Sequence, residues 1–147
     1  MSLVFLVHVL TTLMVAGIMW FIQLVHYPLL RHVGRSSFVA YETTHTRLAI
    51  EVVVSLMVIE SITAGLLLLG RPQGITLAQC WIGVLLLTII WWSTLRLQVP
   101  QHHILASGFD EHAYRRLVGS HWIRTGSYSA RALLMLWMIS GAMKATP

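Results

Sequence analysis

Four histidines recur at matched spacings in this chain of 147 residues. His26 and His45 are 19 residues apart (45 − 26), and His102 and His121 repeat that distance (121 − 102). An offset of 76 (102 − 26) carries the first pair onto the second. Neutral imidazole is the commonest nitrogen ligand for iron, copper and zinc in proteins. The pattern therefore predicts that these four histidines hold a transition metal or another cofactor, provided that the fold brings both pairs together.

Two alternatives accompany this interpretation. A single histidine is more often a hydrogen-bonded residue than a metal ligand, so the prediction depends on the matched spacing of the set. His103 stays an alternative ligand to His102, because spacing does not distinguish adjacent histidines. Iron or copper is favoured over zinc as the metal. The alternative cofactor is a haem b with two of the histidines as axial ligands and arginines on its propionates.

A carboxylate accompanies the first histidine pair. Glu42 and His45 form a Glu-x-x-His pair, the i, i+3 arrangement that places both side chains on one helix face in di-iron carboxylate bundles. Glu42 is therefore a candidate additional metal ligand. Val118 stands where the second half would need a matching glutamate, so a symmetric carboxylate-bridged di-iron centre is not supported. The alternative is that Glu42 is an interfacial acid paired with Arg35 or Arg47.

A polar stripe leads away from the last histidine. His121, Arg124, Tyr128 and Arg131 follow one another at i, i+3, i+7 and i+10, which is one face of a helix. Arginine can hold an anionic or carbonyl group, and tyrosine can donate a proton, so Arg124, Tyr128 and Arg131 are candidate substrate-positioning or catalytic residues. The structural alternative is a network between helices that also includes Glu51, Gln23 and Gln98.

Two further carboxylates lie within apolar sequence. Glu51 is about 9 Å along a helix from His45 by the rise of 1.5 Å per residue, so we expect it to support the histidine site or to pair with Arg131. Glu60 is some 22 Å from His45 by the same rise, too far to join that site. We expect Glu60 to line a proton or substrate path, or to be a neutral hydrogen-bonded acid.

The elements that must position these residues are membrane helices. The chain is 56% hydrophobic and 10% charged, with a mean hydropathy of +0.74, whereas a soluble domain carries about 25% charged residues. A helix needs about 20 apolar residues to cross the hydrocarbon core. The sequence predicts a single all-α domain over residues 1–147, with prolines 28 and 100 ending the first and third helices, and with spans at about 3–25, 48–69, 77–97 and 122–143.

The two halves of the chain predict an internal repeat of helical hairpins. Packed together, the hairpins would form an integral membrane four-helix bundle with all four histidines at one end. Basic residues concentrate beside the two longer connections, which predicts that this end is cytoplasmic and that both termini are not. The net charge of +5 is explained by this orientation, so no nucleic-acid partner is expected. The expected location is a bacterial inner membrane.

A short pattern in the second half consists of Val99, Pro100, Gln101, His102 and Leu105, followed by Trp122, Arg124 and Arg131. It resembles the pattern of the anthrone oxygenase-like membrane proteins, which are small four-span proteins. The sharp part of the resemblance covers the second half, with departures at His102 and Tyr128, where that family's pattern has asparagine. It implies the fold and oxidative chemistry on an apolar, aromatic compound.

Together these features predict a membrane oxidoreductase or oxygenase whose histidine-bound metal activates oxygen or carries electrons to a lipophilic substrate. A haem b protein is one alternative. A small transporter or channel is another, in which Glu51, Glu60 and the arginines line the path. With four spans per chain, that alternative would favour a homo-oligomer.

Overall fold

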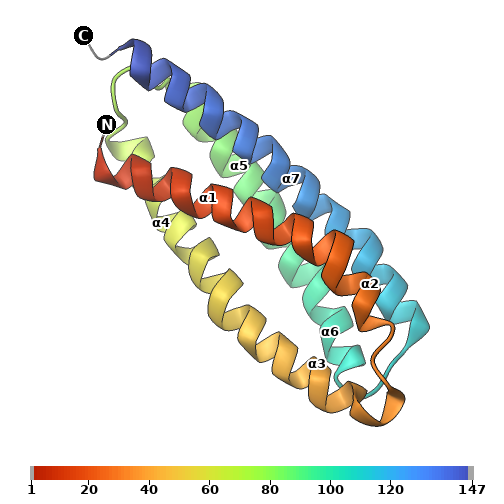
Figure 1. Cartoon of the computed structure of the whole chain (residues 1–147). Helices are drawn as coiled ribbons and strands as arrows, with labels where there is room; N and C mark the ends of the chain where they lie inside the picture. The colour runs from red at the N-terminus through yellow and green to blue at the C-terminus, as the bar shows by residue number, and fades with distance from the viewer. Residues whose placement is uncertain (1, 146–147) are drawn as a thin grey trace.

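The computed structural model describes residues 2–145, and no strand occurs among them. Four long helices follow one another along the chain (Figure 1). Three of them contain a five-residue π-helical segment, labelled η. In chain order the elements are α1 (Leu3–Phe21), η1 (Ile22–His26), α2 (Tyr27–Leu30), α3 (Arg35–Ala49), η2 (Ile50–Val54), α4 (Ser55–Leu69), α5 (Leu77–Ser93), η3 (Thr94–Gln98), α6 (Val99–Leu105) and α7 (Glu111–Lys144).

The segments η1 and η3 each end two residues before a proline. Pro28 and Pro100 have no N–H to donate, and the hydrogen bond just before each of them spans five residues instead of four. The helix thereby passes the proline without a break. The prediction that these prolines end their helices is therefore wrong, because helical structure continues to Leu30 and Leu105. As a result His102 lies on a helix and not in a loop.

Side-chain caps fix the starts of the last two long helices. Asp110 accepts a hydrogen bond from the Ala113 N–H at 2.7 Å and so caps α7, while Thr76 opens α5 with a capping box. The connection before α5 packs on the end of α7. Gly74, with a φ of 81°, lies so close to Gly141 that a Cβ on either would overlap the backbone of the other.

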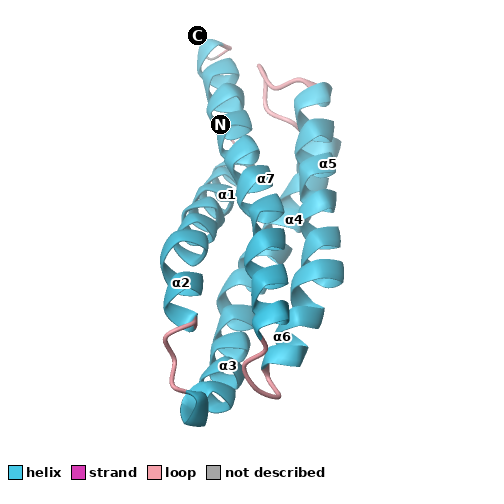
Figure 2. Cartoon of the chain, turned by 90° about the vertical axis from the view of Figure 1, so that its right-hand side faces the viewer, coloured by secondary structure: helices cyan, strands magenta, loops and turns pink. Residues whose placement is uncertain are grey.

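Each long helix packs against two others. The α1 segment contacts α4 and α7, and α5 also contacts α4 and α7. The described ends of the chain lie together at one end of the molecule, and the ends of α2, α3 and α6 lie at the other (Figures 1 and 2). We call this second end the α2–α3–α6 end. It is the end where the predicted histidines gather.

Three of the long helices have the length and composition to cross a membrane. They are Leu3–Leu30, Arg35–Leu69 and Leu77–Leu105, with mean hydropathies of 2.2, 2.3 and 1.6 over their best windows. Large apolar side chains such as Phe21, Ile62 and Leu85 face outward and are more than half exposed. So much exposed apolar surface is typical of lipid contact, which marks the chain as a membrane protein. Helix α7 is less apolar because arginines interrupt it.

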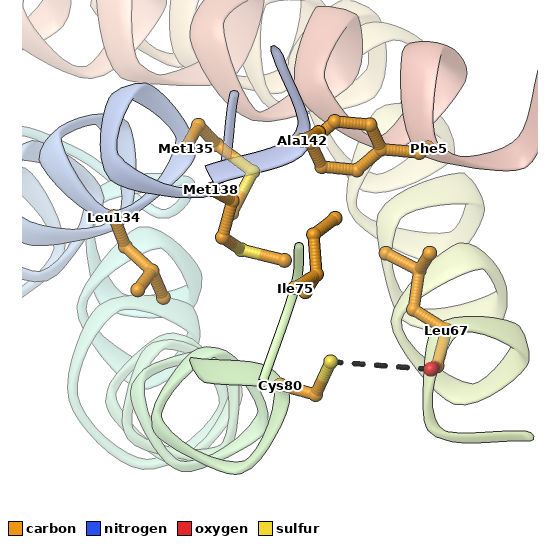
Figure 3. Close-up of a cluster of buried hydrophobic side chains, with 8 residues drawn as sticks. All are labelled: Phe5, Leu67, Ile75, Cys80, Leu134, Met135, Met138 and Ala142. Carbon is orange, nitrogen blue, oxygen red and sulfur yellow. Dashed lines mark hydrogen bonds between the residues drawn. The ribbon is translucent and has the colours of Figure 1, made fainter. Parts of the chain in front are cut away.

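Apolar clusters alternate with polar residues along the interior. The cluster at the end with the termini joins all four long helices and includes Cys80, whose thiol meets the Leu67 carbonyl at 3.9 Å (Figure 3). A middle cluster surrounds Val15 and Tyr128, and a third surrounds Phe38 at the α2–α3–α6 end. The interior therefore encloses two separate layers of buried polar side chains. The members of the first cluster are Phe5, Leu67, Ile75, Cys80, Leu134, Met135, Met138 and Ala142.

Candidate functional site

Three of the predicted histidines meet at the α2–α3–α6 end. The rings of His26 and His45 stack with their centroids 4.2 Å apart, and the His45 ring is 5.9 Å from that of His102. Glu42, one turn before His45 on α3, places Oε1 2.5 Å from His102 Nδ1. We call His26, Glu42, His45 and His102 the histidine cluster. It joins the first, second and third long helices.

The histidine cluster has buried polar atoms without partners. Glu42 is fully buried, and its second oxygen, Oε2, has no hydrogen-bond partner. His26 Nε2 is likewise buried and unpaired. Leaving such atoms unsatisfied costs about 1–3 kcal/mol each, more for a charged group. The cluster therefore offers one oxygen and one nitrogen to a proton, a metal or a ligand atom.

His121 lies apart from the other three histidines. The Tyr27 ring packs edge-on against His121 at 4.9 Å and lies 5.9 Å from the His26 ring. Gln23 directs its Nε2 to the Val118 carbonyl at 3.4 Å, so its oxygen accepts from His121 Nδ1 at 2.8 Å. This assignment leaves His121 Nε2 as a buried lone pair without a partner. The predicted ring of four histidines is therefore divided into three and one.

No group of three or more His, Cys, Asp or Glu side chains among residues 2–145 is arranged to hold a metal ion. The rings of His26 and His45 stack on each other, and His102 Nδ1 is hydrogen-bonded to Glu42. Their convergence is thus a feature of the structure, whereas a metal on them stays a prediction.

A cavity of about 390 Å³ opens beside the histidine cluster. That volume is within the usual range for small-molecule sites, roughly 300–1,000 Å³. Its walls come mainly from α3 and η2 on one side and η3 and α6 on the other, and most of them are apolar. His45 and His102 contribute from the cluster, and Arg124 reaches the cavity from α7. Apolar lining residues include Ile22, Ile50, Val53, Val54 and Val99.

Arg124 is a buried cation without an anionic partner. Its side chain is 7% exposed, and no carboxylate among residues 2–145 pairs with it. Its Nη2 meets the Met57 sulfur at 3.8 Å, and its Nε has no hydrogen-bond partner. Thioether sulfur is a weak acceptor. The guanidinium therefore lies at the cavity wall with an N–H group that no side chain of residues 2–145 pairs with, and its predicted role in positioning a substrate stays a prediction.

Arg131 belongs to a second, fully satisfied layer nearer the termini. Its Nη2 and Nε lie 2.8 and 3.0 Å from Glu60 Oε1, and its Nη1 donates to the Gly83 carbonyl. Tyr128 donates to Glu60 Oε2 at 3.1 Å. Thr12 donates to the same carboxylate from α1 at 2.5 Å. We call these residues, with His8 and Thr63, the Glu60–Arg131 network.

The predicted role of Glu51 is wrong. Its side chain is 58% exposed and faces Arg47 at 3.9 Å, so it neither pairs with Arg131 nor contacts the cavity. At about 100° per residue, position 51 falls on the helix face opposite Glu42, and position 60 returns to the same face. Glu60 therefore takes the buried position that was expected for Glu51.

His102 is the member of the adjacent pair that reaches the cluster. It bonds Glu42, while His103 is exposed and lies at the margin of the cavity. His8 is not among the residues that the sequence predicted for the site, yet its ring lies between Thr63 at 2.8 Å and Arg131 at 3.3 Å. The polar pair His8 and Thr12, four residues apart in an apolar segment, was the signal that could have identified this inward face.

Comparison of the chain with protein-family models, curated proteins and solved structures finds no match. The resemblance to the anthrone oxygenase-like proteins thus stays a prediction from its short motif.

Proposed function

We propose that this chain is a membrane-embedded oxidoreductase that acts on a lipophilic small molecule in the cavity beside the histidine cluster. One observation carries the proposal: a largely apolar cavity of about 390 Å³ has the imidazoles of His45 and His102 and the buried guanidinium of Arg124 on its wall. Convergent polar groups in an apolar cavity are typical of substrate sites. A transporter would need a continuous path across the membrane instead, whereas this cavity lies at one end of the molecule.

The proposed setting is a four-helix bundle with α7 as its fourth span, from about residue 122 to 143. The arginines that lower the hydropathy of α7 are Arg124 and Arg131, and both are buried inside the molecule. Polar groups in membrane helices usually face the interior. In the proposed orientation the α2–α3–α6 end is cytoplasmic, and the two hairpins form the repeat that the histidine spacing predicted.

Glu42 and His102 supply the proton chemistry in this proposal. Because His102 Nδ1 is directed at Glu42, the carboxylate orients the ring and leaves Nε2 to accept a proton. The Arg124 guanidinium would hold an anionic or carbonyl group of the substrate and so position it beside His102. In the oxidase form of the reaction, the substrate loses two electrons and two protons. Dioxygen takes up the two electrons and the two protons and becomes hydrogen peroxide.

The cofactor in this proposal is a transition metal. The residues that would hold it are His26 and Glu42, whose Nε2 and Oε2 atoms are buried without partners, together with His45. Mixed imidazole and carboxylate ligands suit iron and copper. When bound, such a metal would carry electrons between substrate and dioxygen.

The experiment is metal analysis and an absorption spectrum on one preparation of the full chain in nanodiscs. We expect iron or copper in stoichiometric amount in the wild type. The double variant His45→Ala/His102→Ala should lose it, and the matched single variant His103→Ala should keep it. Metal-free wild type after reconstitution with iron and with copper would overturn the metal proposal, and so would a Soret band, which indicates haem.

A further inference from the structure

The buried charge of Arg124 determines which kind of ligand the cavity can bind. Taking a guanidinium out of water is costly unless an opposite charge or several hydrogen bonds replace the water. Arg124 has no carboxylate partner among residues 2–145, its Nη2 contacts only the Met57 thioether, and its Nε has no hydrogen-bond partner. Its guanidinium cannot escape the cost by losing its proton. The missing anion must therefore come from outside the described chain.

The cavity is where that anion would lie. Arg124 lines it, together with Tyr27 and Ile22 from the first helix, on the wall that α7 and the first helix form. The cavity surface as a whole is mainly apolar, although polar side chains such as Thr46, Thr94 and Gln98 also line it. A molecule that complements both the Arg124 guanidinium and the apolar cavity surface would carry one negative head group and an apolar body.

From this arrangement we infer that the cavity binds an amphiphilic monoanion, a single carboxylate or comparable oxyanion on an apolar chain or ring, with its head group on Arg124. The inference deepens the proposed function, since it names the substrate class of the same cavity. A dianionic phosphate would leave one charge unmatched, because Arg47, the other cation on the cavity wall, has a side chain that is 69% exposed and paired with Glu51.

Size and access agree with such a ligand. A volume of 390 Å³ holds roughly 13 water molecules at about 30 Å³ each, which corresponds to a ligand of about a dozen non-hydrogen atoms. Ile50 and Val99 line the cavity from η2 and α6 and are 53% and 36% exposed. In a bilayer these exposed side chains would face lipid, so an apolar ligand can enter sideways between the second and third helices.

The test uses decanoate labelled with carbon-13 in its carboxyl group, added to the full chain in nanodiscs, with protein-free nanodiscs as the blank. We expect saturable binding of decanoate, and binding of decan-1-ol that is weaker by about tenfold or more, the factor that corresponds to about 1.4 kcal/mol. Pairing with a guanidinium favours the ionised carboxyl, so the bound carboxyl signal should titrate at lower pH than in the blank.

Three variants identify the source of the preference. Arg124→Gln should bring decanoate down to the affinity of decan-1-ol. Arg47→Gln removes the same charge from the cavity margin and should change the affinity less than twofold. Ala106→Phe narrows the cavity while keeping Arg124, and should weaken both ligands together. This third variant gives a result even if Arg124→Gln fails to fold.

Equal binding of decanoate and decan-1-ol would overturn the inference. It would also be overturned by an unchanged preference in Arg124→Gln, or by a loss in Arg47→Gln as large as that in Arg124→Gln, which indicates surface attraction only. These outcomes do not depend on a metal. Selective decanoate binding to a metal-free chain would contradict the oxidoreductase proposal and support this inference. A metal-bound protein that binds decanoate and decan-1-ol equally would support the oxidoreductase proposal and contradict this inference.

Discussion

Arg124 and Arg131 lie two turns apart on the same face of α7 and are both buried, yet their surroundings differ completely. Arg131 has a carboxylate, a backbone carbonyl and an imidazole around it. Arg124 has the Met57 sulfur and a cavity. A buried charge whose partners come from the chain holds helices together. A buried charge left without them costs stability, which a ligand can restore.

The same contrast separates the two layers of polar residues. In the Glu60–Arg131 network, the carboxylate oxygens accept from Thr12, Tyr128 and Arg131, so three of the four long helices are joined through Glu60. In the layer beside the cavity, nitrogen or oxygen atoms of His26, Glu42, His121 and Arg124 remain unpaired. We interpret the first layer as structural and the second as functional.

The largest expected effect comes from breaking the structural layer. Glu60→Gln removes the charge that compensates Arg131 and should lower the free energy of unfolding by about 3–5 kcal/mol. Denaturant titration in mild detergent, followed by circular dichroism, measures it. The matched control Glu51→Gln changes an exposed carboxylate on the same helix and should have little effect. Equal losses in both variants would contradict the assignment of the two glutamates.

Removing the partner of Glu42 should have the next largest effect. In His102→Ala the Glu42 carboxylate, fully buried, keeps Thr46 at 3.3 Å as its remaining hydrogen-bond donor. We expect the free energy of unfolding to fall by about 1–3 kcal/mol, the usual cost of an unsatisfied buried group. His103→Ala is the matched control, since that imidazole is exposed, and it should unfold like the wild type. If both variants unfold alike, the Glu42–His102 contact is not structural.

Arg124→Met tests the comparison from the other side, because we expect it to leave the free energy of unfolding unchanged or to raise it. Methionine fills similar space without the uncompensated charge, so the empty protein should unfold within about 1 kcal/mol of the wild type or be more stable. Saturating decanoate should stabilise the wild type and leave the variant unchanged. The measurement is the same unfolding titration with and without decanoate. A loss of stability comparable to that of Glu60→Gln would show that Arg124 is structural as well.

Helical periodicity was sufficient to predict most of the architecture and part of the site. Runs of apolar residues gave the membrane helices, and matched spacing placed His26, His45 and His102 at one end. The same periodicity, applied to α3 and α4, would have placed Glu60 inward and Glu51 outward, since nine residues turn a helix by about two and a half turns. That error came from measuring distance along the helix and neglecting the direction of the side chain.

Other features depend on packing between helices, which spacing does not encode. The Tyr27 ring packs against both His121 and His26 and separates His121 from the cluster. The spacing of the histidines does not indicate where this tyrosine ring packs. The π segments before the prolines continue helices that a local rule would end. The lack of a carboxylate partner for Arg124 among residues 2–145 is likewise a property of the assembled interior. It could be found only once every carboxylate had been placed.

The smallest expected effect lies at the surface, where Glu111 pairs with Arg31 and Arg115 at 2.9 and 2.8 Å. Hydrogen bonding from Arg115 and then the charge of Arg31 lower the pKa of this exposed carboxyl. A lowered folded pKa contributes stability above the unfolded pKa, and this contribution is lost as the pH falls through the folded value.

Glu111→Gln should therefore remove a small acid-dependent part of the stability and leave the rest unchanged, as unfolding titrations across the acid range would show. Because solvent-exposed charges are screened, concentrated salt should abolish the difference between this variant and the wild type. The effect of Glu60→Gln should persist in the same salt, since that pair is fully buried. If salt also abolished the Glu60→Gln effect, water would have access to the inner network, and Arg131 would no longer differ in kind from Arg124.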